Sequence, residues 1–309
     1  MSYKTTKITD FQADSSRKNG AKEKQVDSSL YPKRDFRGSK VQVTNSFAVQ
    51  FSYVSQFLQY AFKKSDKPRI SRQEYVNHLG LTRRHAEAMC SMAVAFDLVI
   101  PNKLTITPVG KSMAEGDPYL EFTGTLWILH YNVASNKKWL IWNTLFNEVF
   151  PTRQKITSEE ARESFNGLRE RLSKFTMNKK VRREIAVILD SYTTKSFNKL
   201  GIIQKEDIEY IFQKTDQIPP EILTATTLVF RQRHDPNASG VSMETLIKAP
   251  NSPGRILNME ESTVRRIFDQ ANHKGLLFIE RKADLDQIRF REGITVETLL
   301  EMYYEGLKK

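Results

Sequence analysis

The stretch from Asp117 to Asn136, DPYLEFTGTLWILHYNVASN, constrains the fold most. Apolar and aromatic residues follow one another along most of it, which predicts a helix packed into a core. Two acids, Asp117 and Glu121, precede the apolar run, and His130 lies inside it. Polar groups in such a helix need hydrogen-bond partners. These three side chains are therefore either satisfied by hydrogen bonds within the core or take part in chemistry next to the helix.

The chain carries a large excess of positive charge. It has 48 Lys and Arg against 36 Asp and Glu, which gives a formal charge of +12 over 309 residues. Such an excess predicts a polyanionic partner, nucleic acid first among them. The sequence has no apolar run of about 18 residues, and its N-terminus lacks the apolar core of a secretory signal. We therefore expect a cytoplasmic protein without a membrane partner.

The single cysteine limits the disulfides and metal sites that the chain can form. Cys90 has no second cysteine to pair with, which rules out an internal disulfide and a zinc site built from several cysteines. It lies in an apolar segment, where a small hydrophobe is expected rather than a nucleophile.

Residues 1–42 hold few side chains able to bury surface, which predicts a basic, flexible tail. Its charges either contact phosphates or are simply solvated.

Residues 46–115 are expected to form a winged helix-turn-helix domain. Aromatic and aliphatic residues recur at helical spacing from Phe47 to Phe62 and predict a first helix. Ser71 with Glu74 makes a capping box for a second helix, and Thr82 caps a third. The following segment, LVI-PN-KLTIT, alternates around a turn and predicts a β-hairpin.

In a winged helix the N-terminal end of the third helix enters the DNA major groove, and the hairpin touches phosphates. DNA contacts are therefore expected from Arg83, Arg84, His85 and Lys103. Cations on the first turn oppose the helix dipole, so helix stability does not explain their position. The alternative is a winged helix that binds protein, with these charges solvated.

Residues 117–215 are expected to form a helical middle domain. Several segments there have one apolar face, and a dense basic cluster begins the last of them. The cluster is either a solvated helix face or a patch that binds DNA phosphates, and it consists of Lys179, Lys180, Arg182 and Arg183.

Residues 218–309 are expected to form a second winged-helix-like domain. After Pro219-Pro220 the order of the first domain returns, with three helices, a hairpin around Ala283-Asp284 and one closing helix. DNA contacts are predicted here for Arg265, Arg266, Arg281 and Lys282. The predicted fold is thus mainly α with small β-hairpins, and it could hold a duplex at two places.

Familiar catalytic motifs are missing from the sequence. It contains no Gly-rich phosphate loop, GxSxG, HExxH or histidine-rich cluster, which argues against nucleotide hydrolysis and serine or zinc hydrolase chemistry. Carboxylates remain, and phosphodiester cleavage commonly uses Mg²⁺ or Mn²⁺ held by acids. The candidate catalytic group is Asp117, Glu121 and His130, with Asp117 and Glu121 as metal ligands.

These three residues also have structural explanations. The two acids lie four positions apart and share one helix face only if the helix begins early enough. Asp117 before Pro118 is otherwise an ordinary N-cap followed by proline at the first helical position. His130 on an apolar face is otherwise a core histidine satisfied by a hydrogen bond.

The middle of the chain resembles a bacterial family that is encoded in DNA phosphorothioation loci, the SspB-like DNA-nicking proteins. The shared elements are DPYLE at 117–121, GTLW at 124–127, LHY at 129–131, Trp142 and FNE at 146–148. The resemblance covers roughly residues 46–290. The segment SFAVQFSYVSQF in this chain lacks the histidine that many relatives carry near the first helix.

The resemblance implies that the protein nicks double-stranded DNA, so that sulfur can replace a non-bridging phosphate oxygen. It also implies a cysteine desulfurase, an ATPase and a PAPS-reductase-like sulfurtransferase as partners. The rival hypothesis is a non-catalytic DNA-binding adaptor or transcription regulator, which would bind DNA without breaking it.

Overall fold

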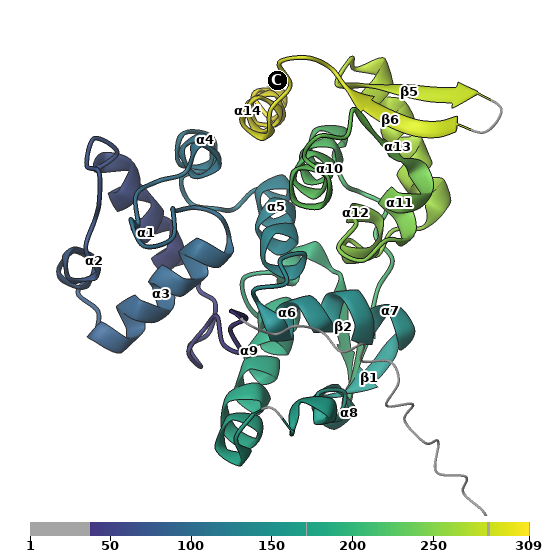
Figure 1. The fold of residues 1–309 in the computed structure, drawn as a ribbon. Helices are drawn as coiled ribbons and strands as arrows, with labels where there is room; N and C mark the ends of the chain where they lie inside the picture. The colour runs from purple at the N-terminus through teal and green to yellow at the C-terminus, as the bar shows by residue number, and fades with distance from the viewer. Residues whose placement is uncertain (1–37, 171, 283–284, 309) are drawn as a thin grey trace, which may run out of the picture. The chain divides into compact units, whose positions relative to one another are not determined.

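The computed structural model describes residues 38–170, 172–282 and 285–308. Its elements (Figure 1) are α1 (Phe51–Lys63), α2 (Arg72–Leu79), α3 (Arg83–Ala95), α4 (Pro108–Gly116), α5 (Thr123–Ala134), α6 (Leu140–Thr144), the π-helix η2 (Leu145–Val149), α7 (Phe150–Thr152), β1 (Lys155–Thr157), α8 (Ser158–Glu163), the 3-10 helix η3 (Asn166–Leu168), the π-helix η4 (Thr176–Val181), α9 (Arg182–Thr193), the 3-10 helix η5 (Asn198–Leu200), β2 (Ile203–Glu206), β3 (Glu209–Phe212), α10 (Pro220–His234), β4 (Gly240–Ser242), α11 (Met243–Lys248), α12 (Pro253–Ile256), α13 (Glu261–His273), β5 (Leu277–Lys282), β6 (Leu285–Phe290) and α14 (Val296–Gly306).

The predicted N-terminal tail extends too far along the chain. Residues 1–37 lie outside the described residues, but the end of the predicted tail, 38–42, is part of the fold. Lys40 forms a parallel bridge with Trp139, and the next residues continue into the core, where Val43 is buried. The polar residues of this segment predict a tail. Its partner in the fold, Trp139, lies about a hundred positions further along the chain, so the local sequence pattern does not show the contact.

The helices α2 and α3 lie where the sequence predicts them, whereas α1 begins at Phe51 and not at Phe47, because Asn45 and Ser46 take positive φ just before it. Ser71 and Glu74 form the expected capping box, each accepting the backbone N–H of the other. Thr82 caps α3 by accepting the N–H of His85. Phe57 of α1 packs face to face with the buried Tyr75 of α2, with ring centroids 3.7 Å apart.

The predicted first hairpin is much smaller than expected. It consists of one antiparallel bridge between Val99 and Ile106 around a tight turn. Asn102 and Leu104 have φ of 68° and 58° in that turn, a left-handed conformation that ends regular strand pairing. The chain then enters α4, a helix that the sequence analysis did not predict although Thr107 caps it and Pro108 begins it.

The helix α5 is the centre of the core, which confirms its predicted packing. All of its residues from Gly124 to Ala134 are buried, polar ones included. Figure 1 shows it between α10 and α6, and it contacts both of them. A helix that is apolar on every side is stable only when other elements surround it completely.

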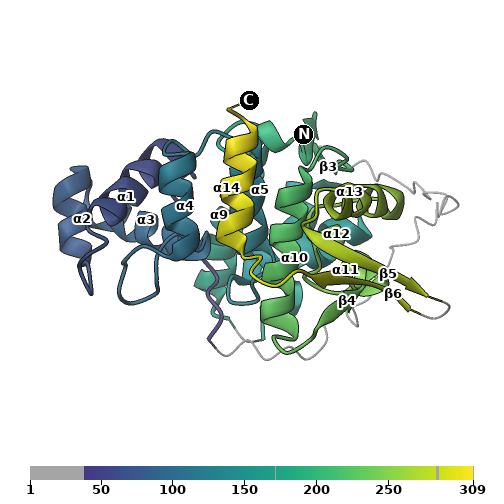
Figure 2. The same cartoon turned by 90° about the horizontal axis from the view of Figure 1, so that it is seen from above.

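The C-terminal helix α14 packs against α4 and the start of α5 (Figure 2). The N–H of Gly124 donates to the hydroxyl of Tyr303 at 2.9 Å, and the hydroxyls of Thr125 and Tyr304 lie 2.8 Å apart. A Cβ at Gly124 would overlap the ring of Tyr303, and one at Gly116 would overlap the ring of Tyr304. Glycine at these two positions therefore lets α14 approach the backbone.

The middle of the chain, which was predicted to be helical, also contains a sheet. Its three antiparallel strands have the order β1–β3–β2. In the β2–β3 hairpin Ile203 pairs with Phe212 and Glu206 pairs with Glu209, and Asp207 takes a φ of 51° in the turn. Strands of three or four residues are too short to show a clear alternation of apolar and polar side chains, so the sequence pattern did not reveal them.

The C-terminal region follows the predicted order of elements more closely. Helices α10, α11, α13 and α14 and the β5–β6 hairpin are all present, and a short strand β4 adds to the hairpin to give the order β4–β6–β5. Figure 2 shows the three strands next to α11. The hairpin pairs Leu277 with Phe290 at one end and Lys282 with Leu285 at the other. The mainly α fold with small antiparallel sheets is therefore confirmed.

Candidate nucleic-acid interface

The first turn of α3 exposes two of its three predicted contacts. Arg83 is 83 % exposed and pairs with Glu87 one turn later, with Nε and Oε1 3.1 Å apart. The guanidinium of Arg84 is also exposed and lies 5.9 Å from the ring centroid of Phe47. His85 stacks on Phe47 at 4.3 Å, and burial lowers its pKa. The arginines can reach a ligand, whereas His85 belongs to an aromatic stack.

Lys103 lies in the tight turn that follows α3. Its carbonyl accepts the N–H of Ile70 at 2.8 Å, which fixes the turn next to the start of α2. Its side chain is exposed and forms no ion pair with any residue that the structure describes. Its ammonium is therefore available to a phosphate, and the predicted DNA contact stays a prediction.

The four cations of residues 179–183 lie on η4 and the first turn of α9. All four are exposed, and within the described ranges none of them pairs with an acid. The ammonium of Lys179 lies 5.2 Å over the ring of Phe175, which is 58 % exposed. Cations next to an exposed aromatic ring suit the backbone and bases of a nucleic acid.

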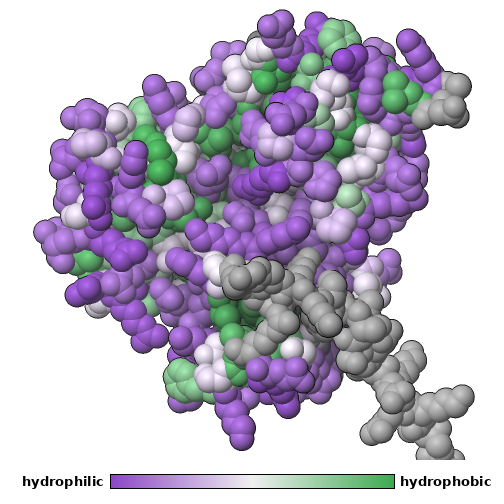
Figure 3. Space-filling model, in the orientation of Figure 1, coloured by the Kyte–Doolittle hydropathy of each residue, from purple (hydrophilic) through white to green (hydrophobic). Residues whose placement is uncertain are grey.

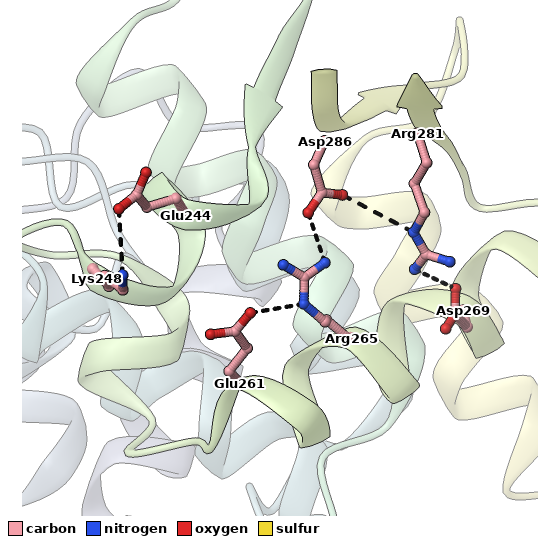
Figure 4. Close-up of polar contacts among 7 residues, drawn as sticks. All are labelled: Glu244, Lys248, Glu261, Arg265, Asp269, Arg281 and Asp286. Atoms are coloured by element: carbon pink, nitrogen blue, oxygen red, sulfur yellow. Dashed lines mark hydrogen bonds and ion pairs between the residues drawn. The ribbon is translucent and has the colours of Figure 1, made fainter. Parts of the chain in front are cut away.

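Two of the four cations predicted to bind DNA in the C-terminal region form ion pairs with acids of the protein (Figure 4). Arg265 binds Glu261 at 2.9 Å and Asp286 at 2.7 Å, and Arg281 binds Asp269 at 2.9 Å. These pairs join α13 to the β5–β6 hairpin. Because carboxylates of the protein already neutralise both guanidinium groups, the electrostatic reason for placing DNA there is weak.

The other two cations of that region keep their charge available. Arg266 donates to the backbone carbonyl of Asp216 at 2.9 Å, which leaves its charge without a carboxylate among the described residues. Lys282 is exposed at the end of β5. They are therefore better candidates than Arg265 and Arg281 for contact with a phosphate.

Asp117 holds the turn between α4 and α5. It is 2 % exposed, and its two carboxylate oxygens accept the N–H groups of Glu121 at 2.9 Å and Phe122 at 2.8 Å. Leu120 has a φ of 57° within the same turn. These hydrogen bonds are close to the N-cap role that the sequence offers as an alternative for Asp117. Because α5 begins only at Thr123, however, Asp117 caps the turn before the helix and is not the N-cap residue of the helix itself.

Asp117 and Glu121 do not fit a shared Mg²⁺ or Mn²⁺. Both oxygens of Asp117 are used by backbone donors, whereas the side chain of Glu121 is exposed and lines a groove that Asp117 does not line. Across the part of the chain that the structure describes, no three His, Cys, Asp or Glu side chains are grouped to hold a metal ion. The predicted metal pair thus has no support in the geometry.

His130 lies in the core with both ring nitrogens engaged. Nδ1 is 2.5 Å from the hydroxyl of Tyr192, and Nε2 is 3.2 Å from the carbonyl oxygen of Ile256. A carbonyl can only accept, so Nε2 donates to it and Nδ1 accepts from Tyr192. Burial lowers the pKa of His130 to about 4, against the opposing effect of the bond to Ile256. This environment matches a core histidine better than a catalytic one.

Folding stability is expected to fall as the pH drops, because His130 must stay neutral in the core. The pKa is 6.5 for an ordinary histidine and about 4 in the fold, so this stabilisation is fully present above 6.5 and is lost as the pH falls through about 4. The loss amounts to roughly 3 kcal/mol, at about 1.4 kcal/mol per pKa unit. Urea unfolding across this pH range measures it. His130→Gln should flatten the dependence, and a slope equal to that of the wild type would contradict the assignment.

Sequence reasoning missed a cavity of about 460 Å³ with a basic wall. We call it the basic cavity, and its cations are Lys40, Arg69, Arg72 and Lys138. They come from the segment before α1, the start of α2 and the segment before α6. Short basic runs, KPR at 67–69 and NKK at 136–138, were the only signal in the sequence. Nothing in those runs shows that they converge.

The surface is polar on the face that Figure 3 draws. The face in Figure 3 is largely hydrophilic, with apolar side chains scattered over it. No helix in the described ranges is both long enough and apolar enough to cross a lipid bilayer.

Comparison with known proteins places the chain in a family. No curated protein matches its sequence. Two solved structures share its fold: a magnesium ion-bound SspB crystal structure with a TM-score of 0.69 and an SspB crystal structure with a TM-score of 0.66. Each is 18 % identical and is matched over 88 % of this chain and 89 % of its own. Residues 45–304 match the family described as "Protein of unknown function (DUF4007)", and because that match spans most of the sequence, the chain belongs to this family.

Proposed function

We propose that this protein binds DNA in a bacterial DNA phosphorothioation system and nicks it so that sulfur can enter the backbone. The observation that carries the proposal is the SspB fold, shared over 88 % of this chain and 89 % of that one. The resemblance of residues 117–148 to proteins of phosphorothioation loci supports it. The proposed partners are the cysteine desulfurase, the ATPase and the PAPS-reductase-like sulfurtransferase of such a system.

The proposed DNA interface uses the cations that no carboxylate neutralises. In the described structure these include Arg84, Lys103, Arg266, Lys282 and the four cations of 179–183. Lysine and arginine contacts to phosphates give affinity that does not depend on base sequence and falls with salt.

We further propose that α13 and the β5–β6 hairpin act as the recognition helix and wing of a winged helix. The hairpin pairs six residues of each strand and packs beside α13, whereas the first region has a single bridge in the equivalent place. In backbone geometry the C-terminal region therefore supports this docking better than the first region does, and Arg266 and Lys282 are the cations it offers, because Arg265 and Arg281 are paired with acids.

A non-catalytic DNA-binding adaptor is the second candidate. The observation that favours it is the structural use of the predicted catalytic residues, since the oxygens of Asp117 hold a turn and the nitrogens of His130 bond inside the core. Such a protein would bind DNA with the same salt dependence and would recruit the modifying enzymes without breaking a strand.

Supercoiled plasmid incubated with the protein and Mg²⁺ or Mn²⁺ separates the two functions. We expect open circles, together with a mobility shift that weakens as salt rises, and a parallel sample with EDTA shows whether nicking requires the metal. A mobility shift without open circles would overturn nicking and leave the adaptor. If neither open circles nor a mobility shift is seen, DNA binding itself is overturned. A mock preparation, purified in the same way from cells that do not express the protein, controls for contaminating nucleases.

A further inference from the structure

The basic cavity has cations on its wall and no acid. Lys40, Arg69, Arg72 and Lys138 line it, and no Asp or Glu is among its lining residues. None of the four side chains forms an ion pair with a described residue, in contrast to Arg265 on α13. A concave wall of one charge sign concentrates the field inside it and attracts an ion of the opposite sign.

The cations of the cavity also repel one another. Partial burial lowers the pKa of Lys40, and the nearby charges of Lys138 and Arg72 lower it further. The backbone keeps two of them together, because the N–H of Lys40 donates to the carbonyl of Lys138 at 2.7 Å. Their ammonium groups lie 5.7 and 5.5 Å from the ring centroid of Trp139. A bound anion would relieve this repulsion.

Trp139 adds a donor that has no acceptor. It lines the cavity and is only 1 % exposed, and its indole N–H forms no hydrogen bond in the described structure. A buried donor without an acceptor is unfavourable. The N–H groups of the four cations therefore favour a ligand that carries negative charge and accepts hydrogen bonds.

We propose that the basic cavity binds a phosphate group. A phosphate meets both requirements, and the guanidinium groups of Arg69 and Arg72 can each bind two of its oxygens. The volume of about 460 Å³ lies within the range of small-ligand sites. The phosphate belongs to a DNA strand if the proposed function holds, and this part of the proposal rests on that function. A free phosphate is the other source, and the experiment distinguishes the two.

Titration with inorganic phosphate tests the cavity without DNA. The three tryptophans give three indole N–H signals in a ¹⁵N-labelled sample, and Trp139→Phe identifies the one from the cavity. We expect phosphate to shift the Trp139 signal and to leave that of Trp142, which donates to the buried Glu184, in place. A Trp139 signal that does not move at saturating phosphate would overturn the proposal.

A charge-neutral variant ties the shift to the cations of the cavity. Lys40→Gln with Arg72→Gln and Lys138→Gln should raise the phosphate concentration at half-shift at least about tenfold, since charged hydrogen bonds are removed. The matched control removes the same charge from exposed lysines outside the cavity, Lys195, Lys205 and Lys308. The control should keep the midpoint of the wild type. An equal change in both variants would mean a general charge effect and would overturn the site.

A short DNA duplex in place of inorganic phosphate identifies the source of the group. For the cavity variant we expect weaker DNA binding and a slope of log K against log salt that is smaller by about 1 to 3, at roughly 0.9 for each phosphate that the variant no longer neutralises. Wild-type DNA binding in a variant that has lost the phosphate shift would overturn the DNA part and leave a site for free phosphate. Because the first titration contains no DNA, it decides the cavity even if the proposed function fails.

Discussion

Glu184→Ala is expected to destabilise the fold by roughly 3–5 kcal/mol, because several buried donors lose their acceptor at about 1 kcal/mol or more each. Glu184 is fully buried at the start of α9. Its carboxylate accepts the N–H of Val43 at 2.8 Å, the N–H and hydroxyl of Thr44 at 3.2 and 2.8 Å, and the indole N–H of Trp142 at 3.2 Å. Burial raises the pKa of this carboxyl, and the donated bonds oppose that effect.

Urea unfolding at neutral pH measures the change in the free energy of unfolding. Glu184→Gln keeps one carbonyl oxygen as an acceptor and should lose less than the alanine variant. Glu163→Ala removes an exposed glutamate from α8 and serves as the control, with an expected change within about 0.5 kcal/mol. An alanine variant of Glu184 as stable as that control would show that the buried network contributes little.

Asp117→Ala is expected to cost roughly 3–6 kcal/mol of folding free energy, since two hydrogen bonds to a charged acceptor are lost and each contributes about 1.5–3 kcal/mol. The change leaves the N–H groups of Glu121 and Phe122 without their acceptor, in a turn that already holds Leu120 at positive φ. Asp117→Asn keeps one acceptor oxygen and should fall between the wild type and Asp117→Ala. Unfolding in urea gives all three values.

The same variants separate the capping role from a metal-binding role. Glu121→Ala is the control, because that side chain is exposed and should change the unfolding free energy by less than about 0.5 kcal/mol. If Asp117→Asn unfolds like the wild type while plasmid nicking disappears, the carboxylate acts in chemistry and not as a cap. If instead stability falls in both Asp117 variants and nicking persists in Asp117→Asn, the structural role is sufficient.

The sequence predicts the helices best where a cap and an apolar stripe coincide. Ser71 with Glu74 and Thr82 mark the starts of α2 and α3, and the long apolar run after Phe122 marks α5. Thr107 before Pro108 is an equally good signal for α4, although the predicted hairpin beside it obscures that signal. The β1–β3–β2 sheet could not be predicted with equal ease, because pairing of β1 with β3 joins residues more than fifty positions apart.

The candidate sites were harder to predict than the helices, because they depend on contacts between residues that are far apart in the sequence. The pair of Arg265 with Glu261 has helical spacing and could have been foreseen, whereas its second partner, Asp286, comes from another element. For His130 the hydrogen-bond alternative was available from the sequence, but its partners Tyr192 and Ile256 were not. The basic cavity was missed for the same reason, since distant segments of the chain supply its wall.

The contact between α14 and the glycines before and within α5 has a consequence for synthesis of the protein. Gly124 and Tyr303 are 179 positions apart, so the ring that fills the space above Gly124 emerges from the ribosome long after α5 itself. Domains of a growing chain generally fold from the N-terminal side first. Until α14 has been synthesised, the earlier helices α4 and α5 expose the apolar surface that it covers, and chaperones that hold unfolded chains would bind there.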